Sequence, residues 1–176
     1  MVVQANGQRR GRLRELSPTA VAQREGVWSV ATVVARLALA AGFLSAVADR
    51  FGWLGPPHTG QVGWGDFAAY TAYAHTLSPY MPDGLQGAAA WAATTAESLL
   101  GLALLAGVLV RWSALAAMAL LLGFGLSMAL FLGPEAPLSY SVFAAAAAAQ
   151  MLALAPVDTF ALSVDRISTR PPRNNR

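Results

Sequence analysis

The strongest constraint on the fold is a set of four long apolar runs. They cover about residues 27–48, 85–110, 113–133 and 140–157. Each has roughly the 18–25 residues that a helix needs to cross a hydrocarbon core about 30 Å thick. Backbone N–H and C=O groups in lipid must be satisfied within their own segment, so such runs form helices. The sequence therefore predicts an all-α fold, an integral membrane four-helix bundle over residues 27–157, with polar tails at 1–26 and 158–176.

Composition agrees with a membrane protein. Hydrophobic residues make up 56% of the 176 residues and charged residues 12%, whereas an ordinary globular domain is about 25% charged. The mean hydropathy is +0.47. The chain has no cysteine, which excludes disulfide bonds, thiolate metal sites and a thiol nucleophile. The first partner that the sequence predicts is the lipid bilayer.

The placement of the arginines predicts the orientation. Nine lie in the two tails and Arg111 lies between the second and third runs, whereas the other two loops hold only Arg50. The tail arginines are Arg9, Arg10, Arg12, Arg14, Arg24, Arg166, Arg170, Arg173 and Arg176. Because arginine-rich flanks stay in the cytoplasm, we predict that both termini are cytoplasmic and that the loop at 49–84 is outside.

The net charge of +3 and a pI near 10 would also suit a nucleic-acid-binding protein. The arginines lie beside apolar runs, however, so we interpret them as topology signals and anionic-lipid contacts and predict no nucleic-acid partner. Alanine runs and the exclusive use of arginine indicate a GC-rich genome, and the predicted location is the bacterial cytoplasmic (inner) membrane, multi-pass. A cleaved secretory signal ending at "AVA" (46–48) is the competing interpretation, but the first run is too long, contains Arg36 and precedes three more runs.

The outside loop at 49–84 predicts a short amphipathic helix. Asp66 is a suitable N-cap, and Phe67, Tyr70, Ala74 and Leu77 follow it at helical spacing. An aromatic belt at the membrane interface is predicted from five side chains of this loop. They are Trp53, Trp64, Tyr70, Tyr73 and Tyr80. The two histidines, His58 and His75, have no ligand spacing, so no metal site is predicted.

Two charged residues interrupt the apolar runs, Arg36 in the first and Glu97 in the second. At 1.5 Å per residue they lie roughly 14 Å and 18 Å from the cytoplasmic side, so we expect them to form an ion pair that lowers the cost of burying either charge. Gln150, roughly 10 Å deep in the fourth run, is expected in the same polar core. Arg111 is expected to cap the C-terminal end of the second run.

Two interpretations of this pair stay open. It is a buried ion pair that fixes which helices pack together, or it faces a cavity and binds or protonates a ligand. On the second interpretation Glu97 and Arg36 are the candidate catalytic residues. The candidate ligand-binding residues are then Glu97, Arg36 and Gln150.

The stretch "ESLLGLALLAGVLVRWSA", from Glu97 to Ala114, resembles the second-span signature of the DoxX family: a glutamate, a glycine four residues on, a second glycine six residues later, and an arginine. "ARLALAAGFLSAVADRFG" (35–52) resembles the first span of that family, and the resemblance covers about residues 27–157. Many members end the first span with a lysine, whereas this chain has Asp49 and Arg50 and no lysine.

The resemblance implies a four-span fold and a relation to membrane subunits of thiosulfate:quinone oxidoreductase. It favours a membrane subunit of a quinone-linked oxidoreductase system, with quinone as the cofactor. Glu97 would then exchange a proton and Arg36 would polarise a carbonyl oxygen, with electrons passed to or from partner subunits. A non-catalytic accessory, assembly or scaffold subunit of a larger membrane complex is the alternative. A small proton-coupled transporter ranks last, because the last three runs have no proline before Pro156 and no inverted repeat is apparent.

Overall fold

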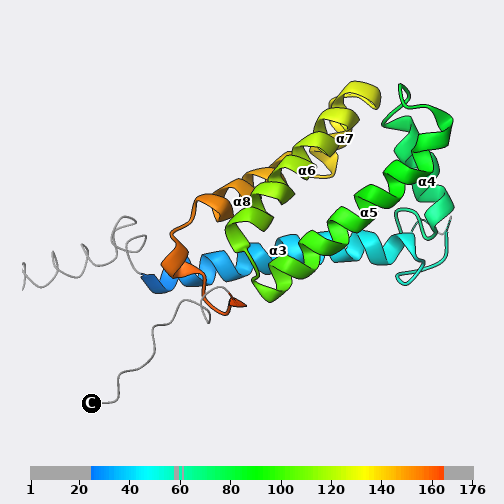
Figure 1. Cartoon of the computed structure of the whole chain (residues 1–176). Helices are drawn as coiled ribbons and strands as arrows, with labels where there is room; N and C mark the ends of the chain where they lie inside the picture. Colours follow the sequence, from blue (N-terminus) through cyan, green and yellow to red (C-terminus); the bar gives the residue numbers. More distant parts are fainter. Residues whose placement is uncertain (1–24, 58–59, 61, 165–176) are drawn as a thin grey trace, which may run out of the picture.

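The computed structural model describes residues 25–57, 60 and 62–164, and this part of the chain contains helices and no strand. Helices are labelled as in Figure 1. In chain order they are α3 (Glu25–Arg50), α4 (Phe67–Thr76), α5 (Asp83–Ala106), α6 (Val110–Phe131), α7 (Glu135–Ser139), α8 (Val142–Leu154) and the short 3₁₀ helix η1 (Val157–Thr159). The predicted all-α fold is confirmed.

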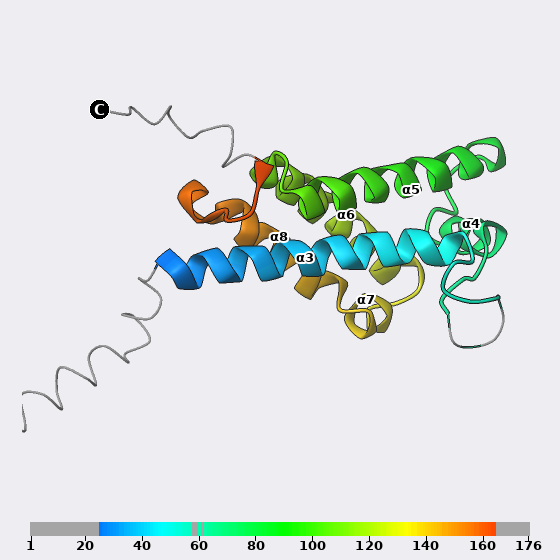
Figure 2. The ribbon, with the colours of Figure 1, turned by 90° about the horizontal axis from the view of Figure 1, so that it is seen from below.

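The long helices form two antiparallel pairs, α3 with α5 and α6 with α8 (Figures 1 and 2). Helix α4 lies at one end of the molecule, which we call the loop end. The two ends of the described chain, Glu25 and Val164, lie together with the α5–α6 turn at the opposite end, which we call the tail end.

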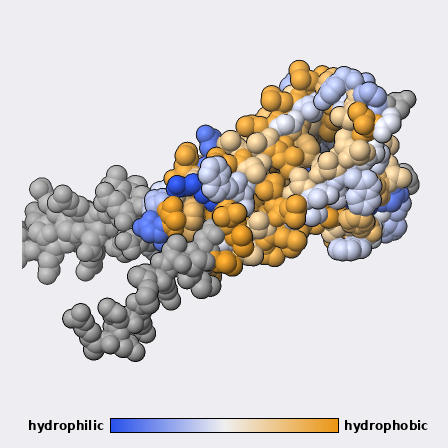
Figure 3. Space-filling view, viewed as in Figure 1, coloured by the Kyte–Doolittle hydropathy of each residue, from blue (hydrophilic) through white to orange (hydrophobic). Residues whose placement is uncertain are grey.

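Three helices are long and apolar enough to cross a membrane: Gly26–Arg50, Gly84–Ala106 and Val110–Phe131. The fourth predicted run is less regular. Helix α8 has 13 residues, which span about 20 Å, and α7 precedes it across a break at Ser141, whose φ is 54°. The middle of the surface in Figure 3 is largely hydrophobic and the hydrophilic residues gather toward the two ends.

Small residues let the helices approach one another closely. Ala114 and Ala117 of α6 are fully buried in the core, as is Ala149 of α8. On α5, a Cβ added at Gly101 would lie 2.9 Å from the side chain of Leu44, so glycine permits the approach of α3. Within the alanine run at 144–149, Ala146 and Ala149 are buried.

The predicted loop helix is confirmed as α4, and the predicted cap as well. The Asp66 side chain accepts a hydrogen bond from the Ala69 backbone N–H at 2.7 Å. Its amphipathic character is weak, because Ala68 and Ala72 form much of the exposed side together with His75.

Candidate functional site

The centre of the candidate site is a buried ion pair between Arg50, the last residue of α3, and Glu97 in α5. Arg50 Nη2 donates to both carboxylate oxygens of Glu97, at 2.8 and 2.6 Å. Both side chains are only 3% exposed. Thr94, one turn before Glu97, accepts a hydrogen bond from Arg50 Nη1 at 2.9 Å and donates to the carbonyl oxygen of Ala90. The guanidinium is thereby held by two side chains of one face of α5.

Helix α4 covers this ion pair with an aromatic side chain. The guanidinium carbon of Arg50 lies 3.7 Å from the centre of the Tyr70 ring and 5.3 Å from that of Trp64, within the range of cation–π attraction. Burial raises the pKa of Tyr70 above its ordinary value, and the charge of Arg50 opposes that rise. Tyr70 therefore stays a neutral phenol at physiological pH. It had been predicted for the interfacial aromatic belt, but it is 5% exposed and belongs to the site.

Asp49 fixes the loop that carries α4. Its carboxylate accepts hydrogen bonds from the backbone N–H groups of Trp64 (2.9 Å) and Gly65 (3.1 Å). The two polar residues that end α3 thus bind different elements. Asp49 binds the loop before α4, and Arg50 binds α5.

An aromatic cluster borders the ion pair. Phe67 packs against Trp91 and Phe51, with ring centres 4.3 and 6.1 Å away, and against Tyr70 at 5.8 Å. Phe51 is 42% exposed and Trp91 is 52% exposed, so the cluster reaches the surface. Arg50 Nε is buried and has no hydrogen-bond partner among the described residues. The site therefore combines a buried donor that has no partner among the described residues, a carboxylate and flat apolar surfaces.

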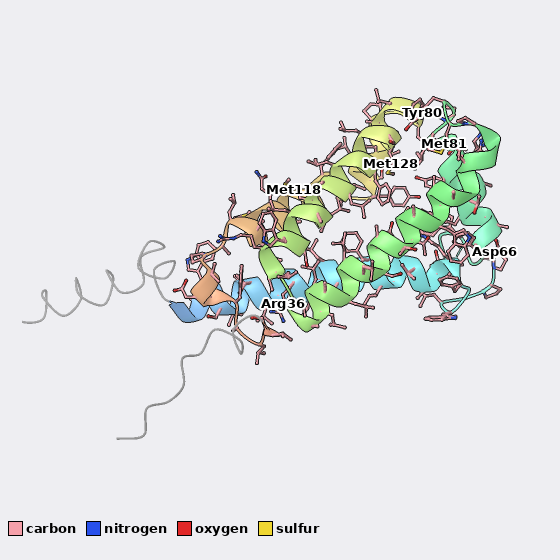
Figure 4. The ribbon with its side chains drawn as sticks, in the orientation of Figure 1. Arg36, Asp66, Tyr80, Met81, Met118 and Met128 are labelled. Atoms are coloured by element: carbon pink, nitrogen blue, oxygen red, sulfur yellow. The ribbon has the colours of Figure 1, made fainter. Side chains whose placement is uncertain are left out.

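The predicted pairing of Arg36 with Glu97 is wrong. Arg36 lies at the tail end, where Nη1 and Nη2 donate to the carbonyl oxygens of Ala161 and Leu162 at 3.1 and 2.8 Å. Figure 4 shows Arg36 part of the way along α3, far from Asp66 at the loop end. Arg36 thus holds the segment after α8, and the structure does not bring it into the candidate site.

The error has a physical cause in the register of α3 against α5. The predicted depths assumed that both runs begin and end level with each other. In the structure Arg36 lies beside Gly107, where an added Cβ would be 2.9 Å from Arg36 Nη1. Gly107 is ten residues beyond Glu97, about 15 Å along the helix. Helix α3 also continues to Arg50, which had been assigned to the loop.

The sequence did contain a pattern that indicates that Arg50 lies on the buried face of α3. Arg36, Phe43 and Arg50 are spaced seven residues apart, so they lie on one face of a continuous helix. All three are buried. Tyr70 and Thr94 carried no comparable signal, because only the folding of α4 over α5 brings them to Arg50.

Two further expectations are corrected. Gln150 is exposed on α8 and lies outside the polar core where it was expected. Arg111 caps α8 rather than α5, donating to the carbonyl oxygens of Ala153 and Ala155 at 3.1 and 3.2 Å. The end of α5 is formed instead by Gly107, which has φ 70° and donates to Ala103 O.

The segment after α8 is not simply a polar tail. Within it Phe160 and Ser163 are buried, and Thr159 accepts a hydrogen bond from the Thr32 hydroxyl at 2.9 Å. We call residues 157–164 the C-terminal strap. The predicted tail residues 1–24 and 165–176 lie outside the described part of the chain.

In the part of the chain that the structure describes, no three His, Cys, Asp or Glu side chains gather where they could hold a metal ion. His58 lies outside that part. No protein-family model matches the chain, and neither a curated protein nor a solved structure matches it. The resemblance to the DoxX family therefore rests on the residues quoted above and stays a prediction.

Proposed function

We propose that the chain is a four-span, DoxX-like protein of the bacterial cytoplasmic membrane, with its tail end in the cytoplasm and its loop end outside. Three membrane-length helices support this placement, and α7 and α8 would together form the fourth span. The described chain ends both lie at the tail end, as two cytoplasmic termini require. The arginine-rich tails supply the positive charge expected on that side.

We further infer that it is a membrane subunit of a quinone-linked oxidoreductase system, and that the site is the Arg50–Glu97 pair. The observation that carries this inference is the buried Arg50 Nε, a hydrogen-bond donor with no partner among the described residues. The guanidinium of Arg50 lies against the Tyr70 ring, and Tyr70 in turn contacts Phe67 of the aromatic cluster formed by Phe51, Phe67 and Trp91. A quinone ring needs hydrogen-bond donors for its carbonyl oxygens and flat apolar neighbours, and these residues fit it.

Each residue then has a definite role. Arg50 donates a hydrogen bond through Nε, Glu97 holds or releases a proton at its carboxylate, and Tyr70 excludes water from the pair. A bound quinone would supply the two-electron chemistry. Partner subunits would provide the electron path, because a chain without cysteine cannot hold a cysteine-ligated iron–sulfur cluster. Arg36, earlier a candidate for polarising the carbonyl oxygen, has no part in this site.

A non-catalytic accessory or scaffold role is the second candidate. It is favoured because the polar side chains of the site already bind one another. Glu97 and Thr94 both accept hydrogen bonds from the Arg50 guanidinium. On this account the pair only joins α3 to α5 and the chain binds a fixed protein partner.

The test is to purify the protein from native membranes in mild detergent and to measure extracted quinone per chain. Wild type is compared with Glu97→Gln and with Thr94→Val, which leaves the ion pair in place. Arg111→Gln is the matched control, because Arg111 is exposed and lies at the tail end. Circular dichroism checks that each variant keeps its helices, and mass spectrometry identifies proteins that purify with it.

The quinone role predicts stoichiometric quinone in wild type and Arg111→Gln, less in Thr94→Val and none in Glu97→Gln. Folded wild-type protein that holds no quinone, and takes up none when it is added, contradicts that role. A fixed protein partner in the absence of quinone would support the scaffold role.

A further inference from the structure

The candidate site is closed in the structure. The side chains of Arg50 and Glu97 are 3% exposed, and Tyr70, which covers the guanidinium, is 5% exposed. A quinone ring that accepts a hydrogen bond from Arg50 Nε can reach this nitrogen only after one of the surrounding elements has moved.

Helix α4 is the least firmly packed helix beside the site. Tyr70 is the one buried residue among its ten, whereas α3 and α5 each bury several residues. Two rings of α4 meet the site, Tyr70 over the Arg50 guanidinium at 3.7 Å and Phe67 against Trp91 at 4.3 Å. Segments with few buried contacts open locally at a small cost in free energy, so α4 is the element expected to move.

Asp49 fixes the start of α4 from the end of α3. Its carboxylate accepts hydrogen bonds from the backbone N–H groups of Trp64 and Gly65, the two residues before the Asp66 cap of α4. Asp49 is 6% exposed, and among the described residues it forms no ion pair. Hydrogen bonds to a carboxylate are stronger than those between neutral groups, so these two bonds determine where α4 lies relative to α3.

Glycine allows the loop backbone to lie close to Asp49. A Cβ added at Gly63 would lie 3.0 Å from Asp49 Oδ2. Gly65 has φ 74°, and a Cβ there would lie 2.5 Å from the backbone nitrogen of Pro57. A side chain at position 65 would therefore be strained and would displace this backbone. The contact between Asp49 and the loop can thus be weakened in two independent ways, by removing the carboxylate or by displacing the backbone.

We propose that α4 is a lid over the Arg50–Glu97 pair, that Asp49 is a positioning residue which holds the lid closed, and that its opening admits the quinone ring to Arg50 Nε. Tyr70 leaves the guanidinium when the lid opens. Arg50 keeps its bonds to Glu97 and Thr94 in the open state, because both acceptors belong to α5. The lid rests on the quinone role proposed above and controls access to that same site.

An introduced thiol measures the opening, because the chain has no cysteine of its own. Thr94→Cys places a thiol of similar size in the closed site, where Thr94 is 3% exposed. Ser113→Cys is the matched control at the tail end, where Ser113 is 8% exposed. The full-length protein is purified in mild detergent, and the rate of its reaction with a water-soluble maleimide is measured. Each thiol is tested alone, with Asp49→Ala and with Gly65→Ala.

The lid predicts that Asp49→Ala and Gly65→Ala each raise the labelling rate at position 94 about 10- to 100-fold, the factor for loss of one hydrogen bond to a charged group. The rate at position 113 should not change. Unchanged labelling at position 94 in either variant would overturn the lid. Equal increases at positions 94 and 113 would also overturn it, because they indicate a general loosening of the fold.

Quinone release separates the lid from the quinone role. In the cysteine-free protein, transfer of bound quinone to empty lipid vesicles should be about 10-fold faster for Asp49→Ala than for wild type. Equal release rates would overturn the role of α4 in admitting the ligand. If wild type holds no quinone while the labelling rates change as predicted, the lid is supported and the quinone role is contradicted.

Discussion

Helix α3 carries two buried arginines, Arg50 at its last residue and Arg36 near its middle, and their charges are satisfied in different ways. At the loop end Arg50 binds the side chains of Glu97 and Thr94, whereas at the tail end Arg36 binds backbone carbonyl oxygens of the C-terminal strap. Both arginines are 3% exposed. The first contact joins two charged side chains, so it depends on protonation and can take part in chemistry. The second depends on the path of the backbone, so it serves the fold.

The largest effect is expected at the loop end. Glu97→Gln leaves the charge of Arg50 buried without its carboxylate, and removal of one partner of a buried pair costs about 3–5 kcal/mol. The free energy of unfolding is measured by detergent titration in bicelles. Arg50→Met combined with Glu97→Leu should recover most of the loss, because apolar residues of similar volume replace buried pairs well. A loss below about 1 kcal/mol in Glu97→Gln would mean that the pair is not buried as described.

Removal of the tail-end arginine should cost less and act locally. Arg36→Met loses the hydrogen bonds to Ala161 and Leu162, at about 1.5–3 kcal/mol for a hydrogen bond to a charged group. Limited proteolysis should then cleave the C-terminal strap first. Arg111→Met is the matched control and should do less, because Arg111 is exposed. If Arg36→Met and Arg111→Met had equal effects, the conclusion that Arg36 holds the C-terminal strap would be contradicted.

The tail end can also be perturbed without touching a charge. At Gly107, which has φ 70°, an added Cβ would lie 2.7 Å from the Cα of Ser163. Gly107→Ala should therefore lower the free energy of unfolding by about 1–2 kcal/mol, because alanine is strained in the left-handed conformation. The added methyl group should also displace the C-terminal strap. Gly123→Ala, in α6 with nothing within 4 Å, should be neutral or slightly stabilising. The same unfolding assay measures the change in the free energy of unfolding for both variants. Similar changes would contradict the close contact between Gly107 and Ser163.

The smallest effect concerns the pH dependence of the loop end. Because burial raises the pKa of Tyr70, the folded protein keeps the phenolic proton after the unfolded chain has begun to lose it. Stability should therefore fall as the pH rises above about 10. Tyr70→Phe should show a shallower alkaline fall, measured as the midpoint of detergent unfolding against pH. Tyr73→Phe is the companion variant, since burial also raises the pKa of Tyr73, and an unchanged curve in Tyr70→Phe would contradict the burial of its hydroxyl.

Hydrophobic length and local capping predicted the helices well, because both are local properties. The three membrane-length helices, and α4 with its Asp66 cap, follow from residues close together in the chain. The partner of Glu97 could not be predicted from depth alone, since it depends on the register of α3 against α5, which side-chain packing at positions such as Gly101 decides. The strap was missed because its apolar residues form neither a membrane-length run nor a regular pattern, and only tertiary contact shows that Phe160 is buried while Leu162 is exposed.

The central claim is that Arg50, and not Arg36, neutralises Glu97, and a pair of double-mutant cycles tests it most directly. The free energy of unfolding is measured in bicelles for Glu97→Gln combined with Arg50→Gln and, separately, with Arg36→Gln. We predict a coupling energy of at least about 1 kcal/mol between positions 50 and 97, and additivity within about 0.5 kcal/mol between positions 36 and 97. Coupling of Glu97 to Arg36 together with additivity at Arg50 would contradict the account.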